Sequence, residues 1–284
     1  MNIVFYSLIK LLALLPMGIL TYFGSFISYI IRLLNYRKKV ILENLSNSFP
    51  ENSRSQNQQL LKKYYQYLGQ LIAETIKIFS ISKNTLKNRF VLKNKQLVQS
   101  YLDKNKDVIL VLGHYGNWEW SLLATSINFS NELIGIYKPL SSSFWNNKIK
   151  QIRSQFGATL VDMNESVRYI LQPNSKARII GIIADQTPSS EQLNYWTIFL
   201  NQKTPVFLGT DKLAKKLDCA VIYANIIPIK NGFYEFSFEL ITDKPSTLKV
   251  GEITNLHTRI LEQKIIERPF YWLWSHRRWK HKQK

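Results

Sequence analysis

The sequence has few of the residues that build disulfides and metal centres. One of its 284 residues is a cysteine, Cys219, and the four histidines lie apart at positions 114, 257, 276 and 281. A single cysteine excludes an intrachain disulfide and a cysteine-based metal site, and it suits a reducing compartment. Cys219 lies in an apolar run, where we expect a buried, unreactive thiol. Neither an HExxH motif nor a phosphate-binding glycine loop is present, so we expect no metal and no cofactor.

Acidic residues are also scarce. Nineteen Asp and Glu stand against 38 Lys and Arg, which gives a formal net charge of +19 at pH 7. This excess attracts polyanions, and three classes of partner fit it: nucleic acid, an anionic membrane surface, or acidic proteins and phosphorylated substrates. Hydrophobic residues make up 45% of the chain and charged residues 20%, a balance that excludes wholesale disorder.

One long stretch carries no charge. Residues 11–31, LLALLPMGILTYFGSFISYII, span twenty-one uncharged positions, enough for a helix that crosses a hydrocarbon core of about 30 Å. We predict a membrane helix here, with a buried core helix or an in-plane or re-entrant anchor as alternatives. Residues 32–39 hold four basic side chains, whereas only Lys10 directly precedes the run. The positive-inside rule then predicts an anchor with a basic flank at 1–36 and a cytoplasmic domain at 37–284.

Beyond the anchor, apolar runs alternate with helical segments. Apolar residues spaced three and four apart between Leu60 and Ile76 predict an amphipathic helix after Pro50. Strands are predicted at 107–113, 133–139, 158–163, 177–185, 219–228 and 234–241, and helices at 117–128, 144–156, 164–172, 209–217 and 252–267. Several strands are apolar throughout, as in sheets covered on both faces. The pattern predicts an α/β fold: one domain with a mostly parallel central sheet flanked by helices, plus the N-terminal membrane helix.

The stretch LGHYGNWEW at 112–120 places polar side chains where a strand ends and ligands gather in parallel sheets. His114 follows the strand, and Asn117 is the expected N-cap of the next helix, which puts Glu119 in the first turn. From there the carboxylate can reach back, hold the imidazole in one tautomer and stabilise the imidazolium. Such a pair can deprotonate a substrate hydroxyl. By itself, the spacing also fits a histidine that only caps a helix.

Two further strands end in polar side chains. Lys138 ends the strand at 133–139, and Asp185 with Gln186 ends the strand at 177–185. Asp185 can cap its strand, or it can position a hydroxyl or a basic side chain of the site. The chain has no Gly-x-Ser-x-Gly elbow, which argues against a serine hydrolase.

Five collinear blocks resemble the glycerolipid-type acyltransferases, in particular the lauroyl/myristoyl-type branch that adds late acyl chains in lipid A biosynthesis. HYGNWE has the His-x-x-x-x-Asp/Glu form of this family. The other blocks are, in order, IYKPLSSSFWNNKIKQIRSQFGATLV, which contains Arg153, then GIIADQTP, TPVFLGTDKLAKKLDCAVI and RPFYWLWSHRRWK. Together they cover essentially the whole chain. Lys138 stands where the family usually has arginine, so the charge is kept and bidentate contact is lost.

The resemblance implies an enzyme that moves a fatty acyl chain from a thioester, carried by acyl carrier protein, to a hydroxyl of a lipid A precursor. It implies His114 as the catalytic base, oriented by Glu119. The expected substrate-binding residues are Asn117, Lys138, Arg153, Asp185 and Gln186. The implied partners are the carrier protein, a membrane glycolipid acceptor and an anionic membrane surface.

Other functions remain open at this point. The acceptor of the same chemistry could be a lysophospholipid, an aminolipid or another glycolipid. From another class, the chain could be a non-catalytic basic protein that binds a membrane or nucleic acid. The tail RPFYWLWSHRRWKHKQK, with tryptophans among its basic residues, fits a nucleic-acid patch or an interfacial belt. The anchor argues against nucleic acid, and the five blocks argue against a protein without catalytic activity.

Overall fold

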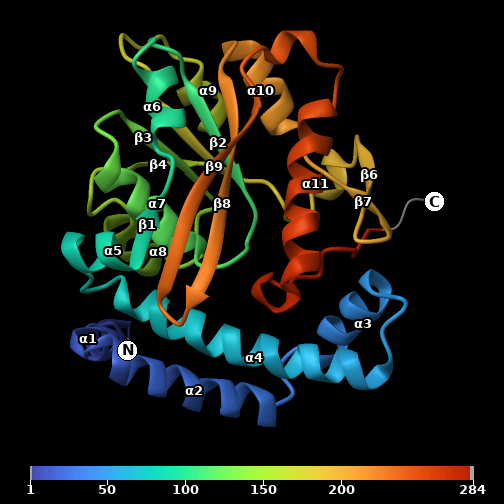
Figure 1. Ribbon diagram of the computed structural model, residues 1–284. Helices are drawn as coiled ribbons and strands as arrows, with labels where there is room; N and C mark the ends of the chain where they lie inside the picture. The colour runs from blue at the N-terminus through green and yellow to red at the C-terminus, as the bar shows by residue number, and fades with distance from the viewer. Residues whose placement is uncertain (1, 282–284) are drawn as a thin grey trace.

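A seven-stranded sheet forms the centre of the computed structural model, which describes residues 2–281 (Figure 1). Its order is β1-β9-β8-β2-β5-β3-β4, and every neighbouring pair is parallel except β8 and β9. The strands are β1 (Phe90–Leu92), β2 (Val108–Leu112), β3 (Leu133–Tyr137), β4 (Thr159–Asp162), β5 (Ile179–Ile183), β8 (Ala220–Lys230) and β9 (Phe233–Thr242). A separate hairpin joins β6 (Trp196–Phe199) to β7 (Gln202–Pro205). The six predicted strands and the mostly parallel α/β sheet are confirmed.

Helices cover both faces of this sheet. They are α5 (Lys83–Arg89), α6 (Gln96–Leu102), α7 (Trp118–Asn128), α8 (Ser143–Arg153), α9 (Ser166–Ile170), α10 (Gly209–Leu217) and α11 (Glu252–Glu267). All five residues of β2 are buried, and they divide between two core clusters: Ile109 and Val111 pack in one, Val108 and Leu110 in the other. Alternate side chains of a strand point to opposite faces, so β2 is apolar throughout because both faces are covered.

The N-terminal apolar run is not one helix. It is divided between α1 (Asn2–Leu14) and α2 (Met17–Leu33). The helix breaks at Pro16, because proline lacks an N–H and its ring would clash with the preceding helical turn. Around the break, the carbonyls of Ala13 and Leu15 accept hydrogen bonds from Lys77 Nζ at 2.8 and 3.0 Å. Residues 11–31 therefore do not form one continuous helix, and the prediction of a membrane helix there is not confirmed.

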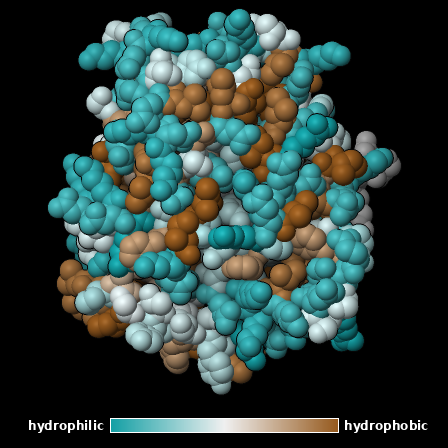
Figure 2. Space-filling model, in the orientation of Figure 1, coloured by the Kyte–Doolittle hydropathy of each residue, from teal (hydrophilic) through white to brown (hydrophobic). Residues whose placement is uncertain are grey.

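Among the described residues, no single helix has the length and apolar composition to cross a membrane. α2 and α3 (Lys38–Ser48), bent by 91° at the turn between them, meet the two criteria together. The predicted boundary at residue 36 falls in that turn. Many apolar side chains of α1 and α2 are exposed, including Ile3, Leu11, Tyr22 and Leu33. In Figure 2, hydrophobic side chains gather at the lower left, where α1 lies.

Helix α2 packs closely on α4 (Arg54–Lys77), the long helix below the sheet in Figure 1. Gly24 and Gly69 face each other, and a Cβ placed on Gly69 would lie 2.3 Å from the Gly24 carbonyl oxygen. Glycine at both positions lets the two backbones approach. α4 begins with a capping box between Ser53 and Gln56. It runs below the sheet edge at which the parallel strand β8 ends, so it forms a floor under the loops that follow the parallel strands (Figure 1).

Candidate active site

His114 and Asp185 meet because their strands are neighbours. β2 pairs in parallel with β5, with Leu112 opposite Ile183, so the residue two positions beyond each strand end lies at the same point of the sheet edge. His114 Nδ1 lies 2.6 Å from Asp185 Oδ1, and the backbone N–H of His114 donates to Asp185 Oδ2 at 2.9 Å. The side chains of His114 and Asp185 are 15% and 6% exposed. The carboxylate is therefore enclosed, while the imidazole is still accessible at its edge.

The carboxylate that orients His114 is not the one expected from the sequence. Glu119 lies in the first turn of α7, as predicted, but it forms a bidentate pair with Arg153 at the end of α8. Arg153 Nε donates to Glu119 Oε2 at 2.9 Å, and Nη2 donates to Oε1 at 2.5 Å. The arginine fork matches both carboxylate oxygens at once, and Asp185 already occupies His114 Nδ1. Asp185 therefore takes the orienting position that was predicted for Glu119.

The Asp185 carboxylate is held in its ionised form. Burial by itself raises the pKa of Asp185, but the His114 charge and the hydrogen bonds from His114 and Trp272 outweigh it and lower the pKa to about 2. The indole N–H of Trp272 donates to Asp185 Oδ2 at 2.7 Å. An ionised Asp185 keeps a proton on His114 Nδ1, which leaves Nε2 as the basic nitrogen of a neutral imidazole. Gln186 is exposed, and its Nε2 lies 3.1 Å from His114 Nε2.

Asn117 fixes the turn that contains His114, between β2 and α7; we call residues 113–117 the catalytic turn. The Asn117 side-chain oxygen accepts from the Trp120 N–H at 2.9 Å, which confirms the predicted N-cap of α7. Its amide donates to Glu74 Oε2 at 2.5 Å, and the residue has no exposed surface. Asn117 was predicted to bind substrate, and its complete burial contradicts direct contact. Glu74 is also fully buried, accepts from Gln70 and Tyr234, and has a pKa raised by its burial.

Gly116 fixes the backbone of the same turn. Its φ of +62° is in the left-handed region, and a Cβ would lie 2.7 Å from the Ile226 side chain. Its carbonyl accepts from the Tyr67 hydroxyl at 2.6 Å, and its N–H donates to the Tyr271 carbonyl at 3.0 Å. α4 and the C-terminal segment therefore hold the His114 loop on both sides.

The C-terminal block packs into the site. Trp272 and Trp274 are 1% and 0% exposed, so the prediction that these tryptophans form an interfacial belt was wrong. Arg278 is also buried and donates to the Pro205 carbonyl at 2.8 Å. Burial lowers the pKa of Arg278 to about 10, against the opposing attraction of the Asp185 charge. The sequence analysis did not predict that Trp272 donates to Asp185. The one indication was that Trp272 lies in the RPFYWLWSHRRWK block, which resembles the family.

The remaining predicted site residues lie at the exposed rim. Lys138 follows β3, the other neighbour of β5, and so reaches the same edge of the sheet; it is exposed and makes no ion pair within residues 2–281. The Arg153 side chain is 30% exposed and has donors beyond the two that Glu119 occupies. In the part of the chain that the structure describes, no three His, Cys, Asp or Glu side chains gather as metal ligands. Cys219 is buried as expected, and burial raises the pKa of its thiol to about 12.

Taken together, these groups can perform general-base chemistry on a hydroxyl. An ionised carboxylate orients a partly exposed imidazole, and cationic side chains lie at the rim of the same sheet edge. No protein nucleophile is needed for such a reaction, because the substrate hydroxyl itself attacks once its proton is removed.

Comparison with known proteins agrees with this chemistry. The profile of the family described as bacterial lipid A biosynthesis acyltransferase matches residues 3–281. The chain is 19% identical over 276 residues to a lipid A biosynthesis palmitoleoyltransferase of Escherichia coli (strain K12), and equally to a lipid A biosynthesis acyltransferase of Shigella flexneri. Each alignment covers 94% of this chain and 86% of the relative. Because the family profile matches nearly the whole chain, the protein belongs to the bacterial lipid A biosynthesis acyltransferase family and is an acyltransferase.

Proposed function

We propose that the protein transfers a fatty acyl chain from the thioester of acyl carrier protein to a hydroxyl group of a lipid A precursor. Membership of the lipid A acyltransferase family supports the reaction class. The observation that carries the proposal is the His114–Asp185 pair, with 2.6 Å between Nδ1 and Oδ1, at the carboxyl edge of a parallel sheet.

The proposed reaction has one attack and one collapse. His114 Nε2 removes the acceptor proton as the acceptor oxygen attacks the thioester carbonyl, which gives a tetrahedral oxyanion. The oxyanion collapses, the carbon–sulfur bond breaks, and the leaving thiolate takes the proton from His114 Nε2. Asp185 stabilises the imidazolium between the two steps. The products are the acyl ester and the free thiol of the carrier, and His114 returns to its neutral form.

Glu119 acts in this proposal through Arg153. The bidentate pair fixes the guanidinium at the rim of the site, and the arginine donors that Glu119 leaves free can bind an anionic group of either substrate. Lys138 and Gln186 lie exposed near the same edge and contribute further substrate contacts. Glu119 therefore positions a substrate-binding residue, while Asp185 positions the base.

The proposed location is the cytoplasmic face of the inner membrane. Exposed apolar side chains on α1 and α2 support contact with lipid, and the net charge of +19 supports contact with anionic headgroups and an acidic carrier protein. A glycolipid acceptor and a soluble carrier could meet at such a surface.

Mass spectrometry of lipid A tests the acceptor. Cells that lack the gene should contain lipid A with one acyl chain fewer, and the wild-type gene should restore that chain while a His114→Ala gene should not. Unchanged lipid A, together with loss of an acyl chain from another lipid, would contradict the proposed acceptor and identify the lipid that replaces it.

A further inference from the structure

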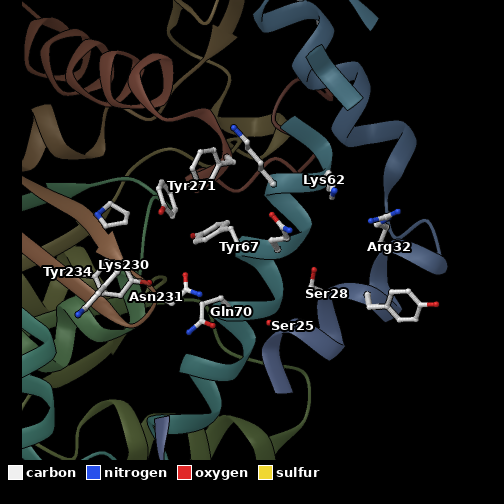
Figure 3. Close-up of a pocket in the computed structure, with 15 residues that line it drawn as sticks. Ser25, Ser28, Arg32, Lys62, Tyr67, Gln70, Lys230, Asn231, Tyr234 and Tyr271 are labelled. Atoms are coloured by element: carbon white, nitrogen blue, oxygen red, sulfur yellow. The ribbon is translucent and has the colours of Figure 1, made fainter. Parts of the chain in front are cut away.

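A cavity lies below the His114 loop, apart from the His114–Asp185 pair. It has a volume of about 600 Å³ and is enclosed by α2, α4, the turn between β8 and β9, and the 3₁₀ turn η3 (Pro269–Tyr271). Figure 3 shows side chains of α2, α4 and the β8–β9 turn around it. Neither His114 nor Asp185 is among its lining residues, and none of the lining residues is acidic. We name this cavity the basic pocket after its four cations, which are Arg32, Lys62, Lys63 and Lys230.

The charges of the basic pocket are not neutralised by the protein. Within residues 2–281, none of its four cations forms an ion pair. Lys63 Nζ lies 5.7 Å from the centre of the Phe270 ring, and Lys230 Nζ lies 4.5 Å from that of Phe233. Aromatic contacts of this kind hold an ammonium group without cancelling its charge. Four unpaired cations around one cavity create a site for an anion with several oxygen atoms.

The inner wall of the basic pocket is polar and uncharged. Ser28, Tyr67, Gln70 and Tyr234 contribute hydroxyl and amide groups. Behind this wall lies the carboxyl of Glu74, which has no exposed surface and accepts hydrogen bonds from Gln70 and Tyr234. The Tyr67 and Tyr234 hydroxyls donate inward, to the Gly116 carbonyl and to Glu74. A ligand in the basic pocket therefore meets cations at the rim and an uncharged wall behind them, and the cations supply the donors that suit a phosphate.

The outer rim of the basic pocket continues into an apolar helix face. Tyr29 lines the basic pocket and is 57% exposed, and on the same helix Phe26 and Leu33 are 58% and 61% exposed. A helix with an exposed apolar face next to basic residues is typical of a segment that lies in a membrane interface. The cations of the basic pocket therefore lie next to the place where lipid headgroups would be.

We propose that the basic pocket binds the phosphate of a lipid headgroup, with the acyl chains of that lipid against the exposed face of α2. An acidic protein would need an exposed surface of matching shape, whereas a phosphate fits a cavity surrounded by cations and bordered by apolar side chains. The proposal rests on the basic pocket and α2 alone, so it stands independently of the acyl-transfer reaction. Tyr67 and Tyr271 line the basic pocket and also bond to Gly116, so a bound lipid would lie directly under the catalytic turn.

Vesicle binding by the full chain tests this proposal. The pocket variant combines Arg32→Gln, Lys62→Gln and Lys230→Gln, which keep polar side chains and remove three charges. The control combines Lys176→Gln, Lys212→Gln and Lys216→Gln, which removes three exposed charges near the amino ends of β5 and β8. The length of five-residue β2 alone separates the two sheet edges by about 15 Å, more than the Debye length of about 8–10 Å in physiological salt.

The expected result is a large difference between the two triple variants. Each basic group near a membrane surface strengthens binding about fivefold, so the pocket variant should bind vesicles containing phosphatidic acid about a hundredfold more weakly than wild type. The control should lose a few-fold at most. Equal losses in the two variants would show that overall charge alone drives binding and would overturn the proposal. Equal binding of the wild type to vesicles of an uncharged glycolipid without phosphate would overturn it as well.

Two further arms identify the source of the phosphate. Short-chain phosphatidic acid should displace the wild type from vesicles far better than inorganic phosphate or glycerol phosphate; equal displacement by the soluble anions would overturn the lipid assignment.

The pocket variant should keep its affinity for acyl carrier protein. Loss of that affinity with unchanged vesicle binding would assign the basic pocket to an acidic protein and overturn the proposal. If the triple variant melts early, Lys62→Gln alone, at an exposed position of α4, should weaken vesicle binding about fivefold, and unchanged binding would again overturn it.

Discussion

Replacement of Asp185 by asparagine should nearly abolish acyl transfer without unfolding the protein. Asparagine keeps the shape of the side chain and one oxygen that can accept from the His114 backbone N–H or from the Trp272 indole, which now bind Asp185 Oδ2. The other position becomes an NH₂ group that faces His114 Nδ1, where Oδ1 now lies at 2.6 Å. An amide N–H there would favour the imidazole tautomer with its proton on Nε2, and Nε2 could then no longer act as the base.

The magnitude follows from the loss of both the charge and the tautomer. The equivalent replacement in the serine-protease triad lowers kcat by about 10⁴. We expect a fall of about 10³ to 10⁴ here, which corresponds to about 4–5.5 kcal/mol of transition-state stabilisation. kcat should fall while KM changes little, because Asp185 is buried and acts through His114.

The assay measures transfer of a labelled acyl chain from acyl carrier protein to lipid A precursor in detergent micelles, with thermal unfolding as the control for folding. The pKa of Asp185 is lowered to about 2, below the ordinary value of about 3.9, so its ionised form stabilises the fold above about pH 4. This contribution, about 2–3 kcal/mol, is lost as the pH falls from 4 towards 2, and the variant should not show that loss. A folded Asp185→Asn protein that keeps more than a tenth of wild-type kcat would refute this role for Asp185.

Three further predictions concern other parts of the fold. Glu119→Gln and Arg153→Gln should each slow acyl transfer. The double variant should be no slower than the worse single variant, because the two side chains form one bidentate pair. Additive losses in steady-state kinetics would contradict this. Gly69→Ala should lower the free energy of unfolding by about 1–3 kcal/mol, because its Cβ would meet the facing α2 backbone. Gly209→Ala is the matched control, because a Cβ there has nothing within 4 Å. Equal melting temperatures of the two variants would refute the close packing. Burial lowers the pKa of His257 to about 4. The free energy of unfolding of the wild type should therefore fall by about 3 kcal/mol between pH 6.5 and pH 4, because only the unfolded chain readily takes up that proton. A His257→Leu variant with the same pH dependence of unfolding would contradict the assignment.

Local patterns in the sequence predict much of this fold. The bounds predicted for α10 and α11 agree with the structure. The apolar run of β2 predicts a strand that is buried on both faces, and Asn117 predicts the start of α7. These features depend on neighbouring residues, so a single sequence contains the information. β1, β6 and β7 were missed, because strands of three or four residues are too short to show a period by themselves; the equally short β4 was predicted from the apolar run over 158–163.

The partner of His114 depends on non-local information. Asp185 lies 71 residues further along the chain, and the two meet only because β5 pairs directly with β2. Hydrophobic periodicity does not give the order of strands in a sheet, so the nearer carboxylate, Glu119, was the natural prediction. The same limit applies to the N-terminus, where average hydropathy over 11–31 hid the break at Pro16. Trp272 reaches Asp185 through the packing of the C-terminal segment, which a linear motif does not describe.

The most direct test of the function is transfer by purified protein in which His114 is replaced by alanine. The wild type should convert lipid A precursor and acyl carrier protein thioester into a product that is heavier by one acyl chain, and His114→Ala should form product no faster than the reaction without enzyme. His114→Ala should melt earlier than the wild type, because the buried Asp185 carboxylate loses its Nδ1 partner, so transfer is measured well below the melting temperature of the variant. Product formation by folded His114→Ala at the wild-type rate would contradict the proposed mechanism.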